Sequence, residues 1–229
     1  MVEAKSDLRT LDFIHMVYLP PHFIESDSSA IYGLIEANPL GMLITMGSQG
    51  ITANPIPCVL DRDWGEQGRL LLHVARNNPV WRDVDPGLEA LVVFQSVDRY
   101  ITPNWYPSKQ TTHEVVPTWN YAMAQVRGEL IVHDDERWVR GQAGKLTKMM
   151  EASEPVPWKM ADAPRKYTEG ILANIVGIEI PIRSLIGKTK ASQNRLPEDA
   201  AGAVAGLRAR GSDADLAMAA LIERSRPTP

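Results

Sequence analysis

Short apolar runs separated by turns that contain glycine or proline constrain this chain more than any other feature of its sequence. The clearest case is residues 40–60, where apolar runs at 42–46 and 51–60 flank the turn GSQG. Two strand-like runs joined by a short glycine-containing turn are typical of a β-hairpin. Further runs of strand character lie at residues 69–75, 90–97, 115–132 and 175–182, and we expect the last of these to be the final strand. The pattern predicts a mainly β fold, a small barrel with peripheral helices.

Four segments carry helical signals instead. Residues 27–29 (DSS) offer caps for a helix with Ile31, Leu34 and Ile35 on its apolar face, and the Asn38–Pro39 pair ends it, because the residue before proline avoids the α region. Residues 77–84 predict a short helix with a proline in its first turn. Residues 136–151 and 198–223 predict two longer helical segments, the second interrupted at residues 211–212.

Length and composition limit the classes of protein that fit. A chain of 229 residues supports one substantial core. We expect a leader at residues 1–15, a barrel domain at 16–196 and a helical tail at 197–229 packed on that domain. The single cysteine, Cys58, can form no internal disulfide, and the net charge of −4 gives no global attraction to nucleic acid. No apolar stretch is long enough to span a bilayer, so we expect a cytoplasmic protein without a membrane partner.

Residues 100–121 (YITPNWYPSKQTTHEVVPTWNY) hold an unusual density of aromatic and polar side chains. The proline and polar content of residues 102–114 predicts an ordered loop. Exposed tryptophans beside Lys109 would suit a flat, anionic ligand. Alternatively, Trp105 and Trp119 plug the two ends of the barrel, and physical chemistry alone slightly favours this second interpretation.

Other chemistries find less support in the sequence. The five histidines are scattered, and neither a GxSxG elbow nor a Walker lysine motif occurs, so a metal site, a hydrolase triad and triphosphate hydrolysis are all disfavoured. No helix-turn-helix pattern appears. The best basic patch comprises Arg137, Arg140, Lys145 and Lys148, which are either a solvated helix surface or a dimer-doubled contact to a phosphate backbone.

Several long strings resemble one known family. They are PNWYPSK (103–109) and VVPTWNY (115–121), supported by YLPPHF (18–23), ANPIP (53–57), HVARNNPVW (73–81), KLT with a following glutamate (145–151) and SQNR (192–195). Together they resemble the PaiB-type family of FMN-binding negative transcriptional regulators. Glu114 departs from the family, in which a basic residue is common at that position.

The resemblance implies an FMN-binding split barrel that forms an isologous homodimer, with FMN in a groove at the dimer interface. Strand backbone would contact the isoalloxazine, and polar or cationic side chains would hold the phosphate. The candidate cofactor-binding residues are Ala53, Asn54, Pro55, Ile56 and Pro57; His73, Val74, Ala75, Arg76, Asn77, Asn78 and Trp81; and Trp105, Lys109, Trp119, Gln193 and Arg195.

These candidates have specific expected roles, each with an alternative. Arg76 and the predicted helix start after it would hold the phosphate, although a surface arginine is the simpler interpretation on sequence alone. His73 is equally a ligand contact or a satisfied barrel histidine. Lys109 and Trp119 would cover the flavin from the second subunit, and Gln193 and Arg195 are weaker candidates of the same kind.

The resemblance implies a function in transcriptional regulation, with DNA or a regulatory protein as a further partner. A flavin-dependent oxidoreductase acting on a small molecule is the alternative, because the same barrel hosts both. A barrel that has lost its flavin and serves as an interaction module is a third.

Overall fold

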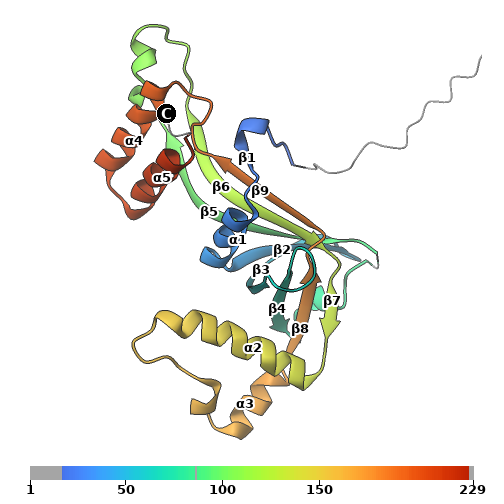
Figure 1. Cartoon of the computed structure of the whole chain (residues 1–229). Helices are drawn as coiled ribbons and strands as arrows, with labels where there is room; N and C mark the ends of the chain where they lie inside the picture. Colours follow the sequence, from blue (N-terminus) through green and yellow to red (C-terminus); the bar gives the residue numbers. More distant parts are fainter. Residues whose placement is uncertain (1–16, 86, 227–229) are drawn as a thin grey trace, which may run out of the picture.

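A computed structural model describes residues 17–85 and 87–226. Its strands are β1 Ile24–Glu25, β2 Leu40–Gly47, β3 Gly50–Asp61, β4 Arg69–Ala75, β5 Ala90–Ile101, β6 Thr118–Gly128, β7 Ile131–His133, β8 Ile175–Pro181 and β9 Ser184–Lys190. Its α-helices are α1 Ser28–Ala37, α2 Glu136–Met150, α3 Arg165–Leu172, α4 Pro197–Arg210 and α5 Asp213–Arg224. The predicted mainly β fold with peripheral helices is confirmed (Figure 1). The expected leader at residues 1–15 lies outside the described residues.

The strands form one antiparallel sheet in the order β1-β9-β6-β5-β2-β3-β4-β8-β7. β8 and β9 are consecutive in the chain, yet they lie near opposite sides of this order. The sheet therefore curls until β6 and β8 meet. The Arg183 N–H donates to the Arg127 carbonyl (2.9 Å), and a Cβ at Gly128 would lie 2.0 Å from the Pro181 carbonyl oxygen. This close approach leaves room only for glycine at that position.

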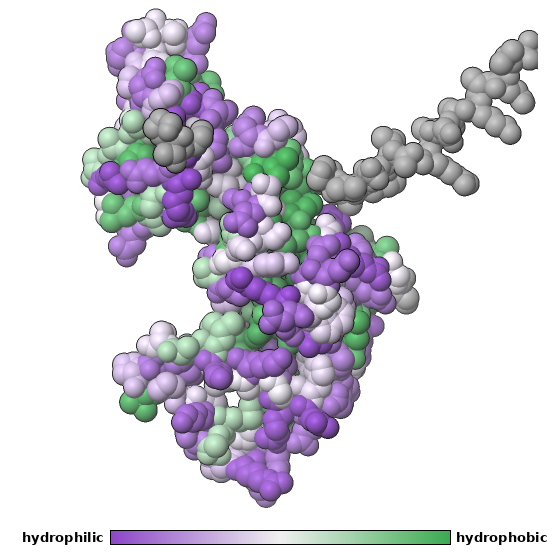
Figure 2. All heavy atoms as spheres, in the orientation of Figure 1, coloured by the Kyte–Doolittle hydropathy of each residue, from purple (hydrophilic) through white to green (hydrophobic). Residues whose placement is uncertain are grey.

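Two hydrophobic clusters fill the fold. The first lies inside the curled sheet and includes Leu43, Phe94 and Ile178, all fully buried. The second lies where the long β5–β6 ribbon meets α4 and α5, with Ile101 and Leu207 at its centre. In Figure 1 the two C-terminal helices cover the far end of that ribbon, whereas α2 and α3 lie at the opposite end of the molecule. Figure 2 shows the surface hollowed between these two parts.

Local sequence signals place several elements as predicted. The 40–60 hairpin is present, with Gly50 in the left-handed region (φ 85°) that favours glycine. Asp27 caps α1 by accepting a hydrogen bond from the Ser29 N–H (2.8 Å). The C-terminal helical segment is interrupted as predicted, because Gly211 (φ 77°) ends α4 and Ser212 caps α5.

Two expectations about elements are wrong. Residues 175–182 are not the last strand, because β9 follows them. In β9 the charged residue Lys188 is buried beside Tyr18 and Tyr121, so the sequence does not show the apolar alternation expected of a buried strand. Residues 77–84 form only a single 3₁₀ turn, Pro79–Trp81. The Trp81 indole N–H donates back to the Arg76 carbonyl (3.0 Å), which folds the segment into a tight turn.

Candidate functional site

The edge of β3 between residues 50 and 57 is open on one side. β3 pairs with β4 only through residues 58–61, so residues 50–57 have β2 as their sole neighbouring strand. The Cys58 N–H donates to the Pro39 carbonyl at the β2 side (2.8 Å). Because successive residues of a strand present their N–H and C=O groups to alternate sides, the backbone of Ala53, Pro55 and Pro57 faces the open edge. Proline fits such an edge because it has no N–H to leave unpaired.

The open edge lies next to the end of β4. The Asn78 Nδ2 donates to the Asn54 Oδ1 (3.2 Å), while the Asn78 Oδ1 accepts from the Val80 N–H (3.0 Å). Two amide side chains from the predicted set are therefore brought together. Ile56 and Val74 instead point into the first hydrophobic cluster, and both are paired in the sheet, Ile56 with Gly41 of β2 and Val74 with Val176 of β8.

Arg76 forms an ion pair within the chain. Its guanidinium donates two hydrogen bonds to Asp134, at 2.9 and 2.6 Å, and its Nε donates to the Ala173 carbonyl (2.8 Å). The hydrogen bond from Arg76 holds the pKa of Asp134 below its usual range and raises that of Arg76. The structure thus directs the Arg76 side chain toward Asp134 and the start of β8, with its charge already matched by a carboxylate.

Arg82 is a cation that sequence reasoning missed. Its guanidinium lies 4.5 Å from the centroid of the Trp81 ring and donates to the Arg76 carbonyl (3.2 Å). Within residues 17–85 and 87–226 it forms no ion pair with a carboxylate. The sequence signal for Arg82 is its position directly after Trp81, the last residue of the HVARNNPVW string. Asn77 is exposed in the same segment.

His73 lies under α2 at the outer face of β4. It hydrogen-bonds to the buried Gln142, which also donates to the Leu71 carbonyl (3.3 Å). A second histidine in this layer, His133, hydrogen-bonds to the buried Glu179 (3.0 Å) and stacks on Trp138 with ring centroids 4.2 Å apart. The contact with Gln142 gives His73 a hydrogen-bond partner within the chain.

The 102–114 loop is ordered by contacts to α4. The N–H and hydroxyl of Ser108 donate to the buried carboxylate of Asp199 (3.0 and 2.7 Å). Trp105 lies against α4 so closely that a Cβ at Gly206 would be 2.2 Å from its ring. The Lys109 ammonium donates to the Asn104 side chain. Trp105 therefore packs against a helix, which corresponds neither to a plug in the barrel end nor to an exposed platform.

Trp119 is the most exposed aromatic side chain of residues 100–121. Its side chain is 53% exposed and meets Tyr100 edge-to-face with ring centroids 6.1 Å apart. Nearby, Lys190 donates to the Thr118 hydroxyl (2.6 Å), and burial lowers its pKa. Trp119 and Lys190 form an aromatic and cationic surface at the outer face of the ribbon.

The two residues predicted after β9 have local contacts. The Gln193 side chain accepts from the Ala191 N–H (2.7 Å) and donates to the Thr189 carbonyl (2.6 Å), which fixes the turn. The Arg195 guanidinium lies 5.0 Å from the centroid of the Tyr106 ring.

The predicted residues thus fall into two groups within one chain. The strand group, at the β3 edge and the end of β4, lies in the barrel. The ribbon group, from the 102–114 loop, Trp119 and the turn after β9, lies at the far end of the β5–β6 ribbon beside α4 (Figure 1). One chain does not gather all of them around a single ligand.

The outer face of the β2–β3 hairpin is apolar and largely uncovered. The cross-strand pairs on this face are Leu40–Pro57, Met42–Pro55, Ile44–Ala53 and Met46–Ile51. Leu40 and Ile51 are 63% and 70% exposed. A contiguous apolar face of this kind is typical of a protein–protein interface.

Two kinds of feature are absent from the described residues. In residues 17–85 and 87–226, histidine, cysteine, aspartate and glutamate side chains do not gather in a group of three that would suit a metal. No helix in that part of the chain has the length and apolar character needed to cross a membrane.

The chain is similar to curated proteins from fungi and bacteria. It is 32% identical to an uncharacterized protein of Emericella nidulans, over 90% of this chain and 96% of that protein. It is 28% identical to the protease synthase and sporulation protein PAI 2 of Bacillus subtilis, over 80% of this chain and 85% of that protein.

Two solved structures with a similar fold are flavin proteins by their names. The flavocytochrome Anf3 of Azotobacter vinelandii superposes with a TM-score of 0.56 at 13% identity, covering 78% of this chain and 73% of that chain. The FAD and heme binding protein of Mycobacterium smegmatis gives 0.52 at 19% identity, covering 72% of each chain. The predicted split-barrel fold is confirmed.

A family model described as "Putative FMN-binding domain" matches residues 17–184, well over half of the chain. This match and the Bacillus relative confirm the resemblance found in the sequence motifs, and FMN is the cofactor that the family implies. The chain belongs to this FMN-binding domain family.

Proposed function

We propose that this protein binds FMN in a groove between two copies of the chain, and that the homodimer takes part in transcriptional regulation. The observation that carries the proposal is the separation of the strand group from the ribbon group. Two copies related by a two-fold axis would bring the ribbon group of one beside the strand group of the other.

The uncovered hairpin face supports the dimer. Its eight side chains are all apolar, from leucine, methionine, isoleucine, alanine and proline. Burying such a face against its symmetry mate removes apolar area from water at about 25 cal/mol per Å². The same face adjoins the open β3 edge, so a dimer formed there would enclose that edge.

The residues at the open edge fit a flavin. The backbone N–H and carbonyl of Ala53 and the carbonyls of Pro55 and Pro57 are donors and acceptors of the kind that pair with the pyrimidine edge of an isoalloxazine. Arg82, with Asn77 and Asn78, would hold the phosphate. Arg76 remains a proposed phosphate contact, although its guanidinium would have to bind the phosphate and Asp134 at the same time. Bound FMN would supply one- or two-electron transfer.

The ribbon group would complete the groove from the second copy. Trp119 is exposed and would cover the flavin face, with Lys190 and Arg195 as nearby cations. Lys109 and Gln193 would contribute indirectly, by hydrogen bonds that fix the conformation of the 102–114 loop and of the turn after β9.

The regulatory role is supported by the name of the Bacillus relative, a protease synthase and sporulation protein. The basic residues proposed for DNA all lie on one helix, α2, where they line grooves or pair within the chain. Arg137 and Lys145 line a groove with Arg69, whereas Arg140 pairs with Glu136 (2.7 Å). We therefore propose that regulation acts through the flavin or a protein partner, without direct reading of bases. The flavocytochrome neighbour supports a second candidate, a flavin-dependent oxidoreductase.

The first experiment combines the visible spectrum of the purified protein with its mass by light scattering. We expect flavin absorption, FMN released on denaturation, and twice the chain mass of 25.4 kDa. Met42→Glu places a charge on the hairpin face and should give monomers that lose FMN. Val156→Glu, at a position 87% exposed elsewhere, is the matched control. A wild-type monomer, or a Met42→Glu variant that keeps both mass and FMN, would contradict the proposal.

The second experiment separates the two functional candidates. NADH and NADPH oxidation with a panel of small acceptors tests the oxidoreductase. Anisotropy titrations with promoter and scrambled DNA at two salt concentrations test direct binding. We expect little turnover and only weak, salt-sensitive DNA binding. Rapid turnover supports the oxidoreductase, and tight sequence-selective binding contradicts indirect regulation.

A further inference from the structure

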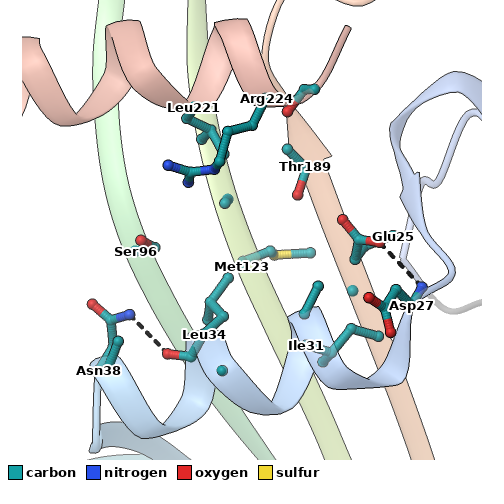
Figure 3. Close-up of a pocket in the computed structure, with 16 residues that line it drawn as sticks. Glu25, Asp27, Ile31, Leu34, Asn38, Ser96, Met123, Thr189, Leu221 and Arg224 are labelled. Carbon is teal, nitrogen blue, oxygen red and sulfur yellow. Dashed lines mark hydrogen bonds between the residues drawn. The ribbon is translucent and has the colours of Figure 1, made fainter. Parts of the chain in front are cut away.

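A cavity lies on the face of the sheet opposite the apolar hairpin face. It has a volume of about 540 Å³, within the range of small-molecule sites. Its walls are α1 and the C-terminal turn of α5, and its floor is formed by β5, β6 and β9 (Figure 3). Buried Ala122 and Gly187 lie on that floor. None of the predicted cofactor-binding residues lines it.

The α1 wall is built to leave space. Ala30, Gly33 and Ala37 line the cavity from this helix. Glycine inside a helix destabilises the helix relative to alanine, so Gly33 within α1 needs a structural or functional explanation. A Cβ added at Gly33 would meet no atom within 4 Å, so packing within the described chain does not require the glycine. The missing side chain at Gly33 leaves part of the cavity open.

Two carboxylates stand at one end of the cavity. Glu25 Oε1 accepts from the Asp27 N–H (3.1 Å), and Asp27 Oδ1 accepts from the Ser29 N–H (2.8 Å). In the described residues, the second oxygen of each carboxylate accepts no hydrogen bond and neither acid forms an ion pair. Together these two oxygens suit an ammonium group.

A guanidinium stands at the other end. Figure 3 shows Arg224 reaching from α5 into the space above Leu34 and Ser96, away from Glu25 and Asp27. Within residues 17–85 and 87–226, Arg224 pairs with no carboxylate. An arginine fork is well matched to a carboxylate group.

The spacing of the two ends selects the length of the ligand. Asp27, which caps α1, and Leu34 within that helix are seven residues apart, which corresponds to roughly 10 Å at 1.5 Å per residue. The ammonium and carboxylate of a free α-amino acid are too close together to reach both ends. An extended tripeptide, at about 3.3–3.6 Å per residue, spans roughly 10 Å.

We propose that this cavity binds a short linear peptide, with its N-terminal ammonium at Glu25 and Asp27 and its C-terminal carboxylate at Arg224. The small floor residues leave space for short side chains. Because the cavity and the hairpin face lie on opposite faces of the sheet, this site does not compete with the proposed flavin groove. The peptide site can therefore be tested independently of the proposed dimer.

The test is calorimetric titration of the full-length protein, as purified, with trialanine. We expect N-acetyl-trialanine and trialanine amide each to bind about tenfold more weakly than trialanine, because each lacks one charged hydrogen-bonding end. Free alanine should bind more weakly still. Arg224→Gln should abolish the difference between trialanine and its amide. The pair Glu25→Gln with Asp27→Asn should abolish the difference between trialanine and its N-acetyl form, and asparagine keeps the helix cap.

Two further variants make the result decisive. Gly33→Leu projects a bulky side chain into the cavity from a position where a Cβ meets no atom within 4 Å, so it should block the ligand while circular dichroism shows an intact fold. Arg208→Gln, on the same helical hairpin but paired with Glu223 outside the cavity, should leave binding unchanged. The proposal is overturned by an absence of binding up to about 10 mM. It is equally overturned if binding survives in Gly33→Leu or amide discrimination survives in Arg224→Gln.

Discussion

Asp215 joins the C-terminal helix pair to the sheet, and its replacement offers the sharpest test of the packing described above. Its carboxylate is 4% exposed and accepts hydrogen bonds from Arg99 Nε and Arg210 Nε, both at 2.9 Å, and from the Ser212 hydroxyl (2.6 Å). It is also the acidic half of the capping box that starts α5. Asp215→Asn keeps the shape of the side chain and removes its charge.

The expected cost follows from the lost charge. A hydrogen bond to a charged group contributes about 1.5–3 kcal/mol, against about 0.5–1.5 kcal/mol for a neutral one, so each arginine contact loses roughly 1–1.5 kcal/mol. The arginine side chains are 29% and 39% exposed, and solvent reduces these values. We expect Asp215→Asn to lower the free energy of unfolding by about 1–2 kcal/mol, chiefly through two weakened arginine contacts that solvent partly screens.

The pH dependence supplies a second signature. The hydrogen bond from Arg210, assisted by those from Ser212 and the attraction of Arg210, holds the pKa of Asp215 well below its usual range despite burial. A carboxylate whose pKa is lowered in the folded state contributes stability above its unfolded pKa, about 3.9, and loses it as the pH falls toward the folded value. The gap between wild type and Asp215→Asn should therefore be constant above about pH 5 and shrink below about pH 4.

Urea unfolding followed by circular dichroism at several pH values measures both effects. Asp213→Asn, at an exposed position in the same helical turn, is the control and should cost less than about 1 kcal/mol. A loss for Asp215→Asn no larger than that of the control would refute this account. So would a gap that stays constant in acid.

Gly206→Ala should lower the free energy of unfolding by about 1–3 kcal/mol and shift tryptophan emission, because the new Cβ would lie 2.2 Å from the Trp105 ring; unchanged emission would contradict this packing. Burial raises the pKa of Cys58 to about 12, so iodoacetamide at pH 8 should label it only after unfolding, and labelling of the folded protein would be the contrary result. In fluorescence titrations with FMN, Arg76→Gln should weaken binding and Asp134→Asn should strengthen it by freeing the guanidinium, whereas equal affinities in both variants would exclude Arg76 from the phosphate site.

The parts of the fold that local chemistry determines could be predicted from the sequence. The 40–60 hairpin follows from its apolar runs and the GSQG turn, and α1 follows from the cap at Asp27 and the stop before Pro39. The break between α4 and α5 follows from Gly211. In each case the signal lies within a few residues of the structure that it predicts.

The remainder depends on contacts between distant residues. The sequence did not predict β9, because the burial of Lys188 depends on its contacts with Tyr18, which lies 170 residues away in the sequence. The Arg76–Asp134 pair, 58 residues apart, has no local signal either. The motif resemblance supplied the cofactor family and implied that Lys109 and Trp119 act from a second subunit, yet it did not place the matching residues at opposite ends of the folded chain. That separation emerges only when the strands are paired.

The division into a strand group and a ribbon group has a genetic consequence. In the proposed dimer each flavin takes the strand group from one copy and the ribbon group from the other. A variant damaged in the strand group and a variant damaged in the ribbon group would each lose both sites as homodimers. Mixed heterodimers would place both defects in one site and leave the other intact. Two alleles that are each inactive alone should therefore complement one another, with half of the sites restored in every heterodimer.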